Sequence, residues 1–238
     1  MSAKSVVPGV YTISLGMVNV FLLDGEELVL IDAGVAGSET RILAAVREIG
    51  RQPQDLKHIL ITHHHSDHVG GLLALQQATG AQVYMHEQDA AAYRKGIMIR
   101  RVESSGGLFS RLAVASINRE VARQSSKTAP PAHARVDHRL AGGETLPLAG
   151  GLRVLYPPGH TAGHVAYLWP QHGGVLFAGD LASHMTGLGY SILYEDFSGG
   201  RRTLSELANL DFEVACFAHG GPILSGAAEQ FRRKFGAK

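Results

Sequence analysis

Four of the thirteen histidines fall within one six-residue segment, 63–68, whose sequence is HHHSDH. Read as His-x-His-x-Asp-His, the segment offers imidazoles at His63 and His65, followed by the carboxylate of Asp67 and the imidazole of His68. Imidazole and carboxylate ligands together suit Zn, Mn or Fe. Because two groups of ligands stand so close together, the spacing indicates two adjacent metal ions. The alternative is a solvated polar loop that is rich in histidine.

Three further residues of ligand type follow short apolar runs elsewhere in the chain: His160, Asp180 and His219. The histidine segment itself begins where the apolar run 59–61 ends. Functional residues of layered α/β proteins commonly lie where a strand ends, at the carboxyl edge of a sheet. The recurrence of ligand-type residues at four such places argues against the solvated loop.

The elements that must position these residues follow from hydrophobic patterning and from glycine and serine at the boundaries. The expected strands are 10–15, 18–23, 28–31, 59–61, 82–86, 136–140, 151–156, 165–169, 175–178 and 214–218. The expected helices are 38–49, 72–78, 87–95, 108–123, 203–210 and 225–235, and 125–134 is expected to be a loop. This alternation predicts an α/β fold, and because no linker divides the chain we expect one domain, 1–238, with two sheet-containing halves.

The bulk composition narrows the class of protein. With 45% hydrophobic residues the chain can bury a sizeable core, and 18% charged residues is too few for a disordered chain. The single cysteine, Cys216, excludes an internal disulfide and is flanked by apolar residues, which favours a buried, inert thiol in a reducing compartment. Residues 1–9 show no secretory signal, and no apolar run reaches the ~20 residues that span a bilayer. We therefore expect a cytoplasmic protein with no membrane contact.

With a net charge of +1, the chain as a whole lacks the excess positive charge that is typical of nucleic-acid-binding proteins. Charge is unevenly distributed, however: residues 94–139 carry ten lysines and arginines against three acidic residues, a net +7, so the remainder carries −6. As a cover over the site, this segment would favour an anionic small-molecule substrate. Two other interpretations remain open, namely amphipathic helices with solvated arginines and a homodimer contact.

Five strings together resemble the metallo-β-lactamase-fold hydrolase superfamily, in its glyoxalase II-like and lactonase-like branch, over nearly the whole chain. They are 20–34 (VFLLDGEELVLIDAG), 62–71 (THHHSDHVGG), 158–164 (PGHTAGH), 177–180 (FAGD) and 219–220 (HG). The resemblance implies a four-layer αββα sandwich with a two-metal site at one edge of the paired sheets. It also implies that the basic helical segment at about 87–135 is an insert in the region where the family varies its substrate-facing cover.

Seven residues are the metal ligands that the resemblance implies: His63, His65 and His160 for the first ion, Asp67, His68 and His219 for the second, and Asp180 as the bridge. The expected cofactors are two divalent ions, with Zn favoured over Fe or Mn. A metal pair ~3.5–4 Å apart can hold a bridging hydroxide and polarise a carbonyl oxygen. The implied reaction is therefore hydrolysis of an ester, thioester or lactone, with Asp67 as a catalytic residue that guides a proton to the leaving group.

Three neighbouring polar residues are expected to act around the ligands rather than as ligands. His64 should point away from the metals, and His164 is expected to make a structural hydrogen bond. Asp32 either orients a ligand imidazole or forms an ordinary turn.

Alternative activities on the same scaffold are a persulfide dioxygenase-like reaction at a single iron and a nuclease reaction. The nuclease is disfavoured because such family members carry an extra substrate domain. Glutathione thioester specificity is not expected, since only nineteen residues follow His219 and that branch carries a helical domain there. Ser183 stands where lactonases of the family place a tyrosine. Lactone hydrolysis therefore remains an open activity without a residue that specifically favours it.

Overall fold

Alternating apolar side chains build the fold from two stacked sheets. In a computed structural model, which describes residues 3–124 and 133–236, Leu28 and Leu30 of β4 (Leu28–Ile31) pack on one face of their sheet. Val29 and Ile31 pack on the other face, against the second sheet. Since successive side chains of a strand point to opposite faces, a strand that is apolar throughout must be covered on both sides.

The first sheet has seven strands in the order β1-β2-β3-β4-β5-β6-β8. Besides β4, this sheet contains β1 (Lys4–Val7), β2 (Val10–Ser14), β3 (Asn19–Asp24), β5 (Leu56–Leu60), β6 (Gln82–His86) and β8 (His138–Leu140). The second sheet has the order β16-β12-β11-β10-β9. Its strands are β9 (Thr145–Leu146), β10 (Leu152–Leu155), β11 (Ala166–Trp169), β12 (Val175–Phe177) and β16 (Val214–Cys216).

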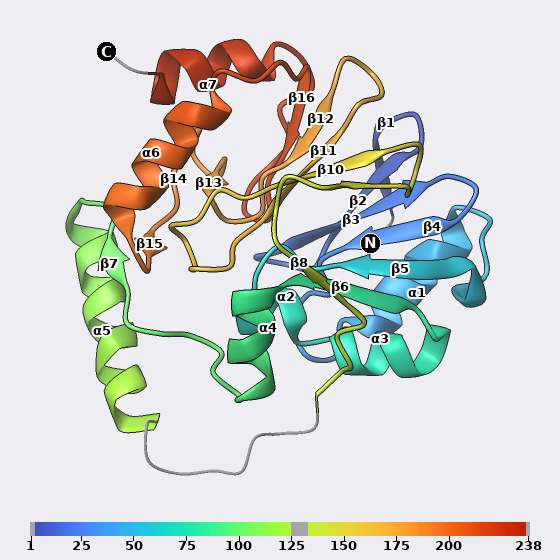
Figure 1. Ribbon diagram of the computed structural model, residues 1–238, viewed down its shortest axis with the longest axis horizontal. Coiled ribbons are helices and arrows are strands. Elements are labelled where there is room, and N and C mark those ends of the chain that lie inside the picture. The colour runs from blue at the N-terminus through green and yellow to red at the C-terminus, as the bar shows by residue number, and fades with distance from the viewer. Residues whose placement is uncertain (1–2, 125–132, 237–238) are drawn as a thin grey trace.

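Helices cover the outer face of each sheet (Figure 1). The first sheet is covered by α1 (Glu39–Glu48) and α3 (Leu72–Thr79), whose apolar residues join the core beneath β4. The second is covered by α6 (Phe197–Leu207) and α7 (Ala227–Phe235), with Phe231 and Leu204 packed on Leu176 of β12. The four-layer αββα sandwich expected from the sequence is thereby confirmed.

Strand direction places the polar residues at one edge. β4, β5 and β6 run parallel to one another, so their carboxyl ends lie side by side. In the second sheet β12 and β16 are parallel, and β10 runs in the same direction because both β10 and β12 are antiparallel to β11. The residues that follow β5, β10, β12 and β16 therefore emerge where the two sheets meet.

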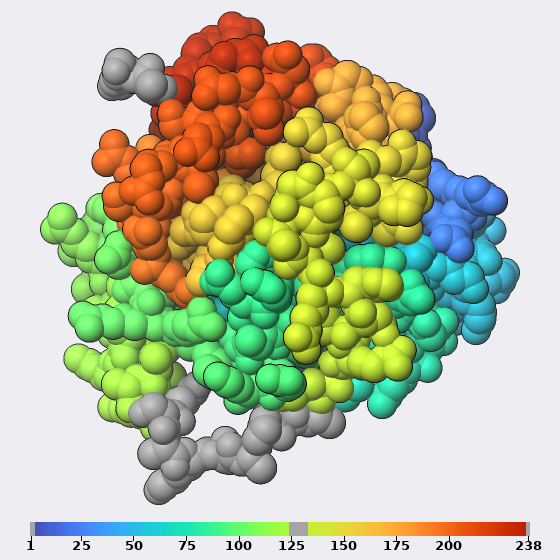
Figure 2. All heavy atoms as spheres, in the orientation of Figure 1, coloured from blue at the N-terminus to red at the C-terminus, as the bar shows by residue number. Residues whose placement is uncertain are grey.

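The basic segment contains α4 (Glu87–Arg94), β7 (Glu103–Ser104) and α5 (Leu108–Gln124). β7 pairs with β15 (Leu193–Tyr194), and Asn118 of α5 exchanges two hydrogen bonds with the backbone of Val102. These contacts hold α5 close to β15. Two further short strands, β13 (Ala182–Ser183) and β14 (Gly189–Tyr190), precede β15 in the chain and pair with each other. Figure 2 shows α5, in light green, on one flank of the surface next to the orange α6.

Several boundaries differ from the expectation. α6 begins at Phe197 rather than at residue 203, because Asp196 accepts a hydrogen bond from the backbone of Gly199 and caps the helix. Its glycines lie where there is no room for a side chain: a Cβ at Gly199 would lie 2.4 Å from Oδ2 of Asp196, and one at Gly200 would lie 2.6 Å from the ring of Tyr194. The helix α7 has Gly226 as its N-cap, not Ser225.

The segment that follows the first histidines is a short helix, α2 (Ser66–Val69), which the expected elements did not include. The expected loop 125–134 lies mainly outside the described residues. Within the described ranges, every helix is too short or too polar to cross a bilayer.

Candidate metal centre

Three imidazoles from two loops converge at the sheet edge. Nε2 of His63 lies 2.9 Å from Nδ1 of His65, and Nε2 of His160 lies 3.1 Å from the same Nδ1. All three side chains are buried. The loop after β5 thus supplies two nitrogens and the loop after β10 supplies the third, as one group of ligand type.

A second group surrounds the two carboxylates. Nε2 of His219 lies 3.2 Å from Oδ2 of Asp180 and 3.5 Å from Oδ2 of Asp67. Nε2 of His68 lies 3.5 Å from Oδ1 of Asp180, and Nε2 of His160 lies 3.5 Å from its Oδ2. Asp180 therefore stands between the two groups, and the structure brings all seven sequence-predicted residues together.

A buried carboxylate holds His68 in place. Oδ2 of Asp32 lies 2.9 Å from Nδ1 of His68, which turns Nε2 of the ring toward the cluster. Asp32 also accepts hydrogen bonds from the backbone and the hydroxyl of Thr62. Of the two interpretations of Asp32, the structure supports the one in which it orients a candidate ligand, an arrangement that raises the basicity of a metal-bound histidine.

Backbone carbonyls orient two other imidazoles. Nδ1 of His160 donates to the carbonyl of Leu193 at 3.0 Å, and Nδ1 of His219 donates to the carbonyl of Met17 at 2.7 Å. Each ring is thereby left with Nε2 as the free nitrogen that faces the cluster. A hydrogen bond at one ring nitrogen sets the tautomer of a histidine and the direction in which it binds metal.

The three imidazoles of the first group are in their neutral, metal-binding form. Burial, together with the neighbouring positive charge of His68, holds the pKa of His63 well below its usual range. Burial and the charge of His160 do the same to the pKa of His65, and burial lowers the pKa of His160. Neutral imidazole is the form that binds a metal ion.

The second group is a set of ionised carboxylates and basic histidines. The charge of Asp180 raises the pKa of His219 to about 11, although burial opposes it. Burial alone would raise the pKa of Asp67, but the charge of His68 and a hydrogen bond with His219 lower it to about 2. The pKa of Asp180 lies well below its usual range for the same kind of reason, since the charges of His219 and His68 outweigh burial.

Unpaired atoms test whether the residues fit a metal. Among the described residues, Nε2 of His68 and Oδ1 of Asp180 are buried, lie 3.5 Å apart and make no hydrogen bond. Buried polar atoms are rarely left unpaired. Nitrogen and oxygen atoms of ligand type converge in three overlapping groups, each within 4.8 Å, and this arrangement fits divalent cations with nitrogen and oxygen ligands.

Sequence reasoning missed Asp89, a buried residue in the first turn of α4. Its carboxylate accepts hydrogen bonds from the backbone of His64 at 3.0 Å, the hydroxyl of Thr161 at 2.7 Å and the backbone of Gly163 at 2.9 Å. Nδ1 of His64 also lies 3.0 Å from it. Asp89 thus joins the loop after β5 to the loop after β10. An acidic residue at a helix start is so common that its position carries no signal of this role.

His164 makes the structural hydrogen bond that the sequence predicted. Burial lowers the pKa of His164 to about 3, so the ring is neutral and its Nε2 accepts from the backbone of Asp180 at 3.2 Å. His64 points away from the cluster toward Asp89, as expected. Cys216 is buried and burial raises the pKa of its thiol, which fits the expected inert role.

A pocket of about 310 Å³ opens onto the cluster. Its described lining includes His65, Asp67, His160, Asp180 and His219, and contains no lysine or arginine.

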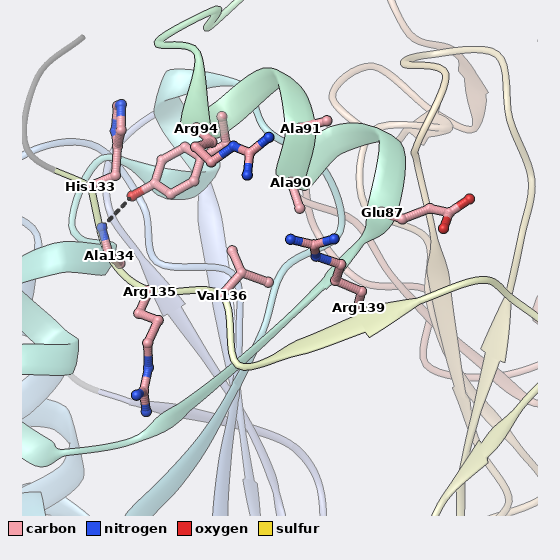
Figure 3. A pocket seen from close by; sticks show the side chains of 10 residues that line it. Glu87, Ala90, Ala91, Arg94, His133, Ala134, Arg135, Val136 and Arg139 are labelled. Carbon is pink, nitrogen blue, oxygen red and sulfur yellow. Dashed lines mark hydrogen bonds between the residues drawn. The ribbon is translucent and has the colours of Figure 1, made fainter.

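The arginines of the basic segment lie elsewhere. Arg100 pairs with Glu195 at 3.3 Å, whereas Arg94 and Arg139 line a separate pocket of about 240 Å³ between α4 and residues 133–139. Figure 3 shows both of these guanidinium groups reaching into that space, with Arg135 extending the other way.

Comparison with known proteins gives one family and several relatives. Residues 13–219 match the model of the metallo-beta-lactamase superfamily. The chain is 34% identical over 167 residues to the uncharacterized protein YobT of Bacillus subtilis, covering 68% of this chain and 61% of that protein. It is 32% identical over 156 residues to a hydroxyacylglutathione hydrolase of Rhodobacter capsulatus, covering 65% of this chain and 43% of the relative. The chain therefore spans less than two thirds of these curated relatives.

A solved structure has the same architecture. A metallo-beta-lactamase family protein of Thermus thermophilus superposes with a TM-score of 0.68 and 28% identity, over 96% of this chain and 79% of that one.

Proposed function

The chain belongs to the metallo-beta-lactamase superfamily, and we propose that it is a hydrolase that uses two divalent metal ions to cleave an ester, thioester or lactone. The observation that carries the proposal is the meeting of seven ligand-type side chains in two groups that share Asp180. The relative from Rhodobacter capsulatus, which is named as a hydrolase, supports the reaction class.

In this proposal one ion is held by His63, His65 and His160, the other by Asp67, His68 and His219, and Asp180 contacts both. Zinc suits this set of nitrogen and oxygen ligands, and iron or manganese is the alternative. When bound, such a pair supplies Lewis acidity at the carbonyl oxygen and lowers the pKa of a coordinated water to about 7.

The protein's own residues position this chemistry. Asp32 and the carbonyls of Leu193 and Met17 hold three imidazoles by their Nδ1 atoms, so their Nε2 atoms are fixed before substrate arrives. The carboxylate of Asp67 lines the pocket and is about one-third exposed (35%). It is therefore the described carboxylate best placed to pass a proton to the departing oxygen or sulfur of a substrate.

Metal analysis of protein purified without added metal tests the function. We expect about two equivalents of zinc per chain, and hydrolysis of a simple aryl ester, a thioester or a lactone that ends when a chelator removes the metal. One equivalent of iron, with oxygen consumption on a persulfide, would overturn the hydrolase. Hydrolysis of phosphodiesters alone would indicate that the protein is a nuclease and not an ester, thioester or lactone hydrolase.

The proton role of Asp67 is tested by Asp67→Asn. The amide oxygen can still bind metal but the side chain no longer carries a proton, so we expect both metals to be retained and kcat to fall about 100-fold. Metal content and steady-state kinetics are measured together, with Asp211→Asn at an exposed position (98%) as the matched control. Full turnover with both metals in Asp67→Asn would contradict the role.

A further inference from the structure

The wall of the pocket beside the metal centre points to the chemical class of the substrate. Resting on the proposed hydrolytic function, we propose that this enzyme acts on substrates with an apolar acyl chain, which the pocket receives. Apart from the candidate ligands and three serines, the described lining is formed by Met17, Met98, Ile99, Met185, Ile192 and Leu193. Apolar walls with a few placed polar groups are typical of sites that bind small apolar ligands.

The mouth of the pocket is apolar as well as its wall. Met17 is 79% exposed, Met185 61% and Ile192 43%, although large apolar side chains are usually buried. Exposed apolar patches of this kind mark binding sites. These three residues come from three different places, namely the β2–β3 turn, the β13–β14 hairpin and the residue before β15, so only the fold assembles them.

Polar groups near the wall are already engaged. The hydroxyl of Ser191 donates to the carbonyl of Asp180, and that of Ser110, in the first turn of α5, donates to the carbonyl of Ile192. The nearby cation Arg100 is held by Glu195, outside the described lining. A negatively charged acyl group would therefore find no lysine or arginine along the described lining and would lose its hydration on entry.

The size and composition of the pocket set the expected length of the chain. A volume of 310 Å³ equals that of roughly ten water molecules, enough for the reacting group and a short to medium alkyl chain. Three of the six wall residues are methionines, whose flexible side chains adapt to different shapes. We therefore expect graded preference for chain length rather than selection of one length.

A series of p-nitrophenyl esters, from acetate through butyrate and hexanoate to octanoate, measures this preference in the metal-loaded enzyme. We expect kcat/KM to rise about two- to fourfold per methylene until the pocket is filled, because each buried methylene stabilises the transition state. Met185→Asp and Ile192→Asp should remove most of this rise, measured as the ratio of kcat/KM for octanoate to kcat/KM for acetate within each variant. Leu224→Asp, an exposed apolar residue (58%) outside the described lining, is the matched control and should behave as the wild type.

The possible results distinguish failure of the apolar acyl specificity from failure of the proposed hydrolytic function. Absence of hydrolysis for every ester, thioester and lactone would overturn the proposed function. Hydrolysis whose kcat/KM is flat or falls with chain length, or a rise that survives both aspartate variants, would overturn the apolar acyl specificity alone.

Calorimetry of the product acids supplies a readout that does not depend on turnover. Hexanoate should bind with a more negative heat-capacity change than acetate, since burial of apolar surface has that signature. The difference should disappear in Met185→Asp. An equal heat-capacity change for the two acids in the wild type would contradict the inference.

Discussion

Asp180→Ala is expected to abolish most of the activity, with kcat/KM reduced about a thousandfold or more, a loss of several kcal/mol of transition-state stabilisation. Asp180 lies within 3.5 Å of the ring nitrogens of His68, His160 and His219, so its carboxylate contacts both proposed ion sites. Its loss removes a ligand from each site and a negative charge that balances the cations. Metal content should fall below two equivalents per chain.

The comparison with Asp180→Asn guards against a variant that simply fails to fold. The amide keeps the volume and one oxygen of the carboxylate, and the backbone of Asp180 keeps its hydrogen bonds with His164 and Ser191. Circular dichroism should then show a folded protein that has lost metal. Asp211→Ala is the surface control. Wild-type kcat/KM with two metals in Asp180→Ala would contradict the assignment of Asp180 as the shared ligand.

Asp89→Ala is expected to give the largest loss of stability, about 3–5 kcal/mol in the free energy of unfolding, because it leaves buried partners unpaired. The carboxylate accepts from His64, Thr161 and Gly163, and all of these donors are buried at the junction of two loops. Urea unfolding of the metal-free protein at neutral pH measures the effect without a contribution from metal loss. Glu87→Ala, an exposed acid in the same helical turn, is the control.

The stabilisation by Asp89 should depend on pH in one direction. Burial raises the pKa of Asp89, but the hydrogen bond and charge of His64 outweigh it and lower the pKa to about 2. The folded-state pKa is thus below the unfolded value of about 3.9. The stabilisation is therefore present above about pH 4 and is lost as the pH falls toward 2. Equal stability of Asp89→Ala and Glu87→Ala at neutral pH would show that the loop junction does not depend on this carboxylate.

Many strands and helices of the fold could be predicted because their causes are local. Val29 and Leu30 pack on opposite faces of β4. In the sequence they belong to a short, uninterrupted apolar run, and such a run is typical of a strand that is covered on both faces. The helix over Leu72–Thr79 ends at Gly80, which adopts the left-handed conformation expected of a C-terminal glycine. The start of α6 was predicted six residues too late: the local cap by Asp196 lies before two glycines that disfavour a helix, and the close packing of Gly200 on the distant Gly159 leaves no sign in the sequence.

By itself, the sequence determined the α/β alternation and the ligand-type residues at strand ends, since hydrophobic period and residue type are properties of short segments, and the resemblance of its motifs to a known family implied the αββα layers and the seven-ligand set. Only the tertiary structure decided the rest. It placed Asp89 between two loops, selected Asp32 as the partner of His68, and assembled an apolar wall from Met17, Met185 and Ile192. These are contacts between residues far apart in the chain, and the spacing of residues along a sequence carries no record of which distant side chains will meet.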